Sequence, residues 1–242
     1  MQLRLNPALD PAPFARFYAA QKAIQIPGLF EEALAYQLEA ALLALPWRLI
    51  CQNDAGQNVV LTRDEIAAMS AEQRRALEDG IRRRAAENFG FTYFTYPMIE
   101  ARLGNWNPGH PIHALTDFLN SAEFIAFAKA LIGEPRLIKI DCHATNYQPG
   151  HFLTRHVDEG DKYERRAAYT IGLSRKWEPD WGGLLLFLDE QLNIKRGFTP
   201  GFNVLTVFDG LMPHTVTAVS TFAPAPRLSI AGWFRDDTPA KL

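Results

Sequence analysis

Three side chains that can bind a divalent metal ion occur in the C-terminal half of the chain. His156 and Asp158 are separated only by Val157, and His214 follows further along. Two imidazoles and one carboxylate can occupy three adjacent corners of an octahedral ion and leave three corners open. Because residues i and i+2 of a strand point to the same face, His156 and Asp158 can reach one ion while Val157 packs away from it. These residues are candidate metal ligands.

An ion held on one side by three protein ligands keeps open positions for reactants. This arrangement is typical of non-haem Fe(II) oxygenases, so the sequence favours a metalloenzyme. A His-x-Asp pair alone would be a weak signal, and the third ligand gives it weight. The other histidines have no partner at ligand spacing, and we interpret them as structural residues: His110, His113, His143 and His151.

Length and composition narrow the protein class. The chain has 242 residues, 48% of them hydrophobic, which suits one domain with an elaborated edge or with a small subdomain. Its formal net charge of −2 argues against a nucleic-acid partner. No apolar run approaches the roughly 18 residues of a membrane span, and the start lacks the apolar core of a signal peptide, so we expect a cytoplasmic protein without a membrane partner. Cys51 and Cys142 lack metal-ligand spacing and are expected to be packing residues.

The first part of the chain is predicted to be mainly helical. Helices are expected at residues 30–45, 62–69, 70–88 and about 121–131. The first has apolar residues at helical spacing and stops at Pro46, the next two open with capping boxes, and the last ends at Gly133. Residues 91–115 are rich in aromatics, Pro, Gly and Asn and are expected to be a long irregular connection beside a binding site.

From Arg136 onward the pattern changes to short β-rich runs separated by turn residues. Strands are predicted near 136–147, 152–158, 167–174, 183–188, 203–208, 214–220 and 227–234. Such a series indicates a sandwich or barrel of the jelly-roll type. We expect residues 1–135 to be a helix-rich portion packing on a jelly-roll core at 136–242, both within one continuous domain.

The order of signals in the second half resembles one enzyme family. The signals are Tyr147-Gln-Pro-Gly150, Phe152, His156-Val-Asp158, Trp181-Gly-Gly183, Phe208-Asp209, Pro213-His214 and the run from Arg227 to Trp233. The series resembles the prolyl 4-hydroxylase-like branch of the Fe(II)/2-oxoglutarate-dependent oxygenases, closely over about residues 136–236 and loosely over the helical front. The resemblance implies a mainly β fold with flanking α-helices, namely a double-stranded β-helix, or jelly roll, with iron in its mouth.

The resemblance also implies roles for individual residues. His156, Asp158 and His214 would be the catalytic Fe(II) ligands. Arg227 would pair with the distal carboxylate of the co-substrate 2-oxoglutarate, a role suited to its planar, two-pronged guanidinium, and Tyr147 would border the co-substrate. Ascorbate is expected to stimulate turnover.

The function implied by the resemblance is hydroxylation, with O2, of prolyl residues in a peptide or protein. Two alternatives stay open at this point. The enzyme could hydroxylate a free amino acid or another small molecule, or the jelly roll could be a binding module that holds a metal without turnover. Arg155, Asp189 and Trp181 are candidates for the rim of the substrate cleft. The sequence leaves the oligomeric state open.

Overall fold

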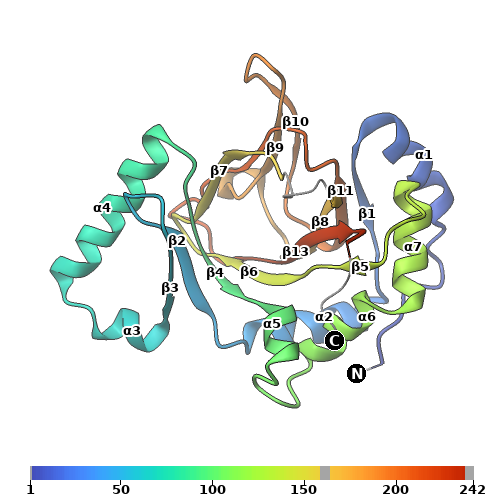
Figure 1. The fold of residues 1–242 in the computed structure, drawn as a ribbon, viewed down its shortest axis with the longest axis horizontal. Helices are drawn as coiled ribbons and strands as arrows, with labels where there is room; N and C mark the ends of the chain where they lie inside the picture. Colours follow the sequence, from blue (N-terminus) through green and yellow to red (C-terminus); the bar gives the residue numbers. More distant parts are fainter. Residues whose placement is uncertain (1, 159–163, 238–242) are drawn as a thin grey trace.

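The computed structural model describes residues 2–158 and 164–237, and in this part of the chain thirteen strands form one antiparallel sheet flanked by seven α-helices (Figure 1). The helices are α1 (Pro11–Gln21), α2 (Glu32–Leu43), α3 (Arg63–Ala68), α4 (Ala71–Glu87), α5 (Met98–Leu103), α6 (Ile112–Leu119) and α7 (Ala122–Ile132). The strands are β1 (Ala23–Pro27), β2 (Arg48–Gln52), β3 (Asn58–Thr62), β4 (Phe91–Tyr96), β5 (Lys139–Ile140), β6 (His143–Tyr147), β7 (Phe152–His156), β8 (Arg165–Leu173), β9 (Leu185–Leu188), β10 (Ile194–Phe198), β11 (Phe202–Phe208), β12 (His214–Val216) and β13 (Arg227–Arg235).

The sheet curls until it is nearly closed into a barrel. Its strand order is β1, β11, β8, β13, β6, β4, β7, β12, β9, β10, with β5 paired to β13 and the β2–β3 hairpin paired to β4. In Figure 1, α2, α5 and α6 lie below the barrel, α1 and α7 lie at one side, and α3 and α4 lie at the other with the hairpin. The expected jelly roll with flanking helices is confirmed.

The two faces of the sheet have different surroundings. On β8, Ala167 and Ile171 belong to the main core, which includes the buried faces of the helices, whereas Ala168 belongs to a smaller cluster inside the barrel. Alternate residues of a strand point to opposite faces, so one strand contributes to both clusters. The inner face is therefore available for a site, while the outer face supports the fold.

The four predicted helices are confirmed as α2, α3, α4 and α7. Thr62 and Ser70 form the expected capping boxes at the starts of α3 and α4. Gly133 ends α7 in the left-handed conformation that glycine adopts without strain.

The expectation that residues 91–115 are irregular was wrong. This segment contains β4, α5 and the start of α6. The alternating Phe-Thr-Tyr-Phe-Thr-Tyr of β4 has strong β-propensity, and it pairs with β2, β6 and β7. Strands β1, β2, β3 and β10 and the helix α1 were also not predicted.

Some strand boundaries differ from the prediction. The strand expected at 136–147 is two strands, β5 and β6, interrupted at Asp141 and Cys142, and the Asp141 carbonyl lies against Gly232 of β13. The strand expected at 214–220 ends at Val216, and the one expected at 152–158 ends at His156, so Asp158 lies beyond the strand.

Replacing Gly232 should test this close contact. A Cβ at Gly232 would lie 1.9 Å from the Asp141 carbonyl oxygen, a backbone atom that cannot move aside. Gly232→Ala should lower the free energy of unfolding by about 3 kcal/mol, measured by denaturant titration. Gly80→Ala is the matched control. Gly80 lies within helix α4, and a Cβ there would meet its nearest atom at an ordinary contact distance of 3.5 Å. Because alanine favours the helix more than glycine does, this change should stabilise the protein by about 1 kcal/mol. Equal effects of the two changes would contradict this account.

Candidate functional site

The structure brings His156, Asp158 and His214 together at the mouth of the barrel. Strand β12 pairs with β7 so that His214 lies directly opposite His156. The Nε2 atoms of His156 and His214 lie 3.6 and 3.5 Å from the two Asp158 carboxylate oxygens. One ligand atom from each residue lies within 4.8 Å of the other two. The three residues thus form a compact donor set of two nitrogens and one oxygen.

Backbone contacts orient the two imidazoles. The Nδ1 atom of His156 lies 2.9 Å from the carbonyl oxygen of Thr154, and that of His214 lies 2.8 Å from the carbonyl oxygen of Met212. Since a carbonyl only accepts, each Nδ1 must carry the proton, which leaves each Nε2 lone pair free to bind a metal. Asp158 is held in turn by its backbone N–H, which donates to the Gly210 carbonyl at 2.7 Å.

The protonation states suit a cation. Burial and the neighbouring His156 lower the pKa of His214 to about 4, so this imidazole is neutral at pH 7. Burial raises the pKa of Asp158, but the nearby side chains of His156 and His214 outweigh it, and the net pKa lies below the usual value. A neutral imidazole and an ionised carboxylate are the forms that bind a metal ion.

The three residues line one end of a cavity of about 550 Å³ inside the barrel. Arg227 and Tyr147 line the same cavity and face each other across the β13–β6 pair. The structure therefore places all five predicted site residues in one space.

Arg227 is a buried cation. Its side chain is only 5% exposed, its guanidinium carbon lies 5.2 Å from the centre of the Tyr147 ring, and burial lowers its pKa. Within residues 2–158 and 164–237, its guanidinium has neither an ion pair nor a hydrogen bond. A buried charge without a partner is costly, so this position calls for an anionic ligand.

Tyr147 forms an aromatic wall of the cavity. Its ring stacks on Tyr93 of β4 with the centroids 4.8 Å apart, and burial raises the pKa values of both phenols, that of Tyr93 to about 12. Both phenols therefore keep their protons at neutral pH and can donate hydrogen bonds.

Of the other residues discussed from the sequence, one lines the cavity unexpectedly and several do not line it. His143, which we interpreted as structural, lines the cavity, whereas His110, His113 and His151 do not. Arg155, Asp189 and Trp181, the rim candidates, are not among the lining residues either. Asp189 instead accepts hydrogen bonds from Gln191 and Asn193 in its own turn.

Sequence reasoning missed several lining residues, among them Tyr93, Thr170, Arg165 and Trp233. Trp233 had a usable signal, because an even spacing from Arg227 on one strand places both on the inner face. Tyr93 had none, because its strand was not predicted.

No helix in the described residues is both long and apolar enough to cross a membrane. The cytoplasmic location expected from the sequence stays a prediction.

Comparison with known proteins agrees with the chemistry of the site. Residues 142–235 match the family model of the 2OG-Fe(II) oxygenase superfamily. No curated protein matches the chain in sequence.

Solved structures share the fold over nearly the whole chain. A prolyl-4-hydroxylase from Pseudomonas putida is 21% identical, with a TM-score of 0.58, over 94% of this chain and 99% of that one. A 2OG-Fe(II) oxygenase family oxidoreductase from Burkholderia pseudomallei is 14% identical, with a TM-score of 0.61, over 98% and 96%. A prolyl hydroxylase from Trichoplax adhaerens, solved with a peptide fragment of hypoxia inducible factor, is 16% identical, with a TM-score of 0.57, over 92% and 87%.

The matched segment contains the whole candidate donor set, Arg227 and Tyr147. The donor set fits Fe(II), and the unpaired Arg227 fits a dicarboxylate co-substrate. The match over residues 142–235 and the shared fold support a 2-oxoglutarate-dependent dioxygenase of the 2OG-Fe(II) oxygenase type, with a prolyl 4-hydroxylase-like fold.

Proposed function

We propose that the protein hydroxylates prolyl residues of a peptide or protein, with His156, Asp158 and His214 holding Fe(II) and with Arg227 and Tyr147 binding 2-oxoglutarate. The observation that carries this proposal is the placement of a three-ligand donor set and a buried, unpaired cation in one cavity. A site that only stored a metal would have no use for such a cation, so the binding-module alternative is set aside.

The bound groups supply the oxidising chemistry: 2-oxoglutarate and O2 become succinate and CO2, and one oxygen atom enters a C–H bond of the substrate. The protein residues supply position. The backbone carbonyls at Thr154 and Met212 fix the imidazoles, and Arg227 fixes the far end of the co-substrate. The aromatic walls at Tyr93 and Tyr147 keep bulk water away from the reacting atoms.

A peptide substrate is supported by the surface around the metal site. Val157, which separates two of the candidate ligands, and Phe89, whose ring lies 5.4 Å from the His156 ring, are each 38% exposed. Leu211, next to the Gly210 carbonyl that holds Asp158, is also exposed. Exposed apolar side chains around a cavity favour a partner that extends beyond it. The Pseudomonas and Trichoplax relatives are prolyl hydroxylases, and the latter was solved with a peptide.

The first prediction concerns the metal. His214→Ala should weaken Fe(II) binding by roughly a hundredfold or more and abolish turnover, because the remaining two ligands form an incomplete chelate. The Asp158→Asn variant should also bind Fe(II) poorly, since the amide lacks the negative charge that favours a divalent cation. Anaerobic titration calorimetry measures the binding, and Arg155→Ala on the exposed side of β7 serves as the control. If the His214→Ala variant bound Fe(II) with wild-type affinity, His214 would not be a metal ligand.

The second prediction concerns the co-substrate. Arg227→Ala should weaken 2-oxoglutarate binding by about 2–5 kcal/mol, because the distal carboxylate would lose its charged partner inside the barrel. Fe(II) affinity should stay within a factor of about three, because Arg227 is not a metal ligand. Unchanged 2-oxoglutarate binding would mean that the co-substrate anchor lies elsewhere.

The third prediction concerns the substrate. A proline-containing oligopeptide should gain the mass of one oxygen atom in the presence of Fe(II), 2-oxoglutarate, O2 and ascorbate, and free L-proline should react poorly because it lacks the contacts that position the ring. Succinate release is measured in parallel, with and without ascorbate. Efficient reaction of a free amino acid, with none on any peptide or protein tried, would favour the small-molecule alternative.

A further inference from the structure

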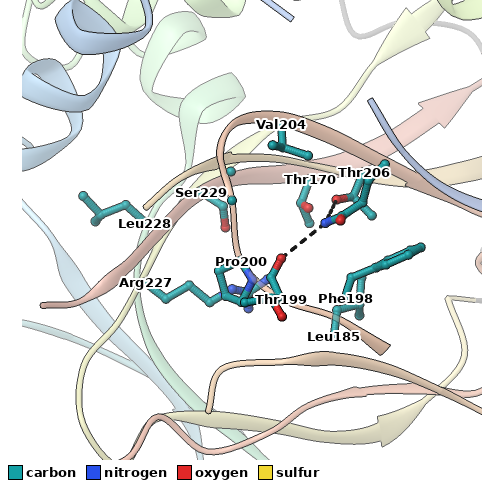
Figure 2. Close-up of a pocket in the computed structure, with 13 residues that line it drawn as sticks. Thr170, Leu185, Phe198, Thr199, Pro200, Val204, Thr206, Arg227, Leu228 and Ser229 are labelled. Carbon is teal, nitrogen blue, oxygen red and sulfur yellow. Dashed lines mark hydrogen bonds between the residues drawn. The ribbon is translucent and has the colours of Figure 1, made fainter. Parts of the chain in front are cut away.

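The barrel cavity narrows and closes beside Arg227. Gln25 of β1, Thr206 of β11 and Thr170 of β8 are paired across neighbouring strands and form a polar row there. The Gln25 amide nitrogen donates to the Thr206 hydroxyl and to the Thr199 carbonyl, both at 3.3 Å, which ties β1 to the segment before β11 (Figure 2). The space that adjoins Arg227 on this side has a volume of about 20 Å³, enough for one water molecule. A long substrate must therefore leave the cavity elsewhere.

On the other side of β13, the inner face of the sheet continues beyond the cavity onto the β2–β3 hairpin. From Arg227, neighbouring residues lead through Tyr147 and Tyr93 to Ile50 of β2 and Val60 of β3. Because residues opposite each other on neighbouring strands point to the same face, these side chains lie on one surface. Val60 is 49% exposed, and among the described strands β3 pairs only with β2. The surface therefore runs from the cavity to an open edge of the sheet.

Two side-chain amides lie on this surface where the hairpin meets the cavity. Gln52 is paired with Asn58, two positions along from Ile50 and Val60 and therefore on the same face. The Gln52 amide nitrogen donates to the Asn58 side-chain oxygen at 3.3 Å. In the described part of the chain, the buried Oε1 atom of Gln52 has no hydrogen-bond partner, and the Asn58 amide nitrogen donates to no acceptor. Asn58 lines the cavity that contains the metal donor set, so the pair offers one acceptor and one donor there.

The chemistry of this amide pair matches a peptide backbone. A buried carbonyl oxygen without a partner destabilises the fold, so Gln52 calls for a donor. Its hydrogen bond to Asn58 fixes the plane of the amide and with it the direction of Oε1. An acceptor beside a donor is complementary to the N–H and C=O groups that repeat along every polypeptide, whereas a free amino acid has no peptide unit.

We propose that the β2–β3 hairpin is a docking surface for the substrate polypeptide, on which Gln52 and Asn58 form hydrogen bonds with the substrate backbone while the target residue lies in the cavity. This inference rests on the proposed peptide hydroxylation, and it names the residues that select a polypeptide over a small molecule. Ile50 and Val60 pack against the peptide segment that leaves the cavity. Because the recognised groups are backbone atoms, the hairpin directs the path of the chain and reads little of its sequence.

Matched glutamine variants of the hairpin test the proposal. The probe is the proline-containing oligopeptide that is hydroxylated most efficiently, and its binding is measured by fluorescence anisotropy on Mn(II)-loaded protein with 2-oxoglutarate. Gln52→Met removes the amide and keeps the length of the side chain, and it should weaken peptide binding roughly five- to tenfold. Gln57→Met changes a glutamine in the turn of the same hairpin that bonds to Asn53 and does not line the cavity, and its effect should be less than about twofold. Both variants should bind 2-oxoglutarate like the wild type.

Methylation of single backbone nitrogens of the peptide identifies the atom that donates to Gln52. At one position, N-methylation should weaken binding to the wild-type protein and cause little further loss in Gln52→Met, because the hydrogen bond is already absent there. Independent losses at every position, or equal effects of Gln52→Met and Gln57→Met, would overturn the proposal and leave a water molecule as the partner of Gln52. If Gln52→Met fails to fold by thermal melting, Asn58→Ala at the exposed end of the pair makes the same test.

The substrate assay separates the docking surface from the proposed function. Hydroxylation of a peptide together with unchanged peptide affinity in Gln52→Met would overturn the docking surface alone. Hydroxylation of a free amino acid, with no reaction on any peptide or protein, would overturn both.

Discussion

The pairing of β12 with β7 is the constraint on which the site depends. It sets His214 opposite His156, and in each case the imidazole Nδ1 donates to a carbonyl two residues earlier on its own chain segment. The same local contact, made twice across one antiparallel pair, aims both Nε2 atoms at Asp158. The aspartate lies past the end of β7 and depends on the Gly210 carbonyl for its position. The donor set is therefore fixed mainly by backbone geometry, which is rigid at this point of the sheet.

The barrel interior also contains two buried charged side chains, Asp158 and Arg227, that do not form an ion pair with each other. Asp158 is surrounded by imidazoles, of which the buried His214 is neutral at pH 7, and Arg227 has no acidic partner among the described residues. Buried charges of this kind destabilise a folded protein. In the proposed function, Fe(II) would satisfy the first charge and the distal carboxylate of 2-oxoglutarate the second. Binding of Fe(II) and 2-oxoglutarate should therefore stabilise the fold.

Much of the second half of the fold and the main site residues could be predicted from sequence, because strand alternation and the His-x-Asp pattern are local signals. The strands of the first half of the chain were harder to predict. Strand β1 is five residues long, and β2 and β3 lie between helices, so their short apolar runs resembled parts of helices or loops. The polar row of Gln25, Thr206 and Thr170 could not be found from sequence because it depends on register: only the pairing of β1 with β11 and of β11 with β8 places these residues side by side.

The two halves of the chain differ in how well the site could be predicted because they supply different parts of the cavity. Metal donors and Arg227 come from the segment that matches the family model, whereas Tyr93 and Asn58 reach the same cavity from β4 and β3 in the first hundred residues. The matched segment carries the groups that the proposed chemistry needs whatever the substrate is. In the proposed function, the walls from β3 and β4 would border the substrate without holding the metal or the co-substrate. Substrate choice should therefore depend on the N-terminal strands, where an overall identity of 14–21% to solved relatives shows the fold alone.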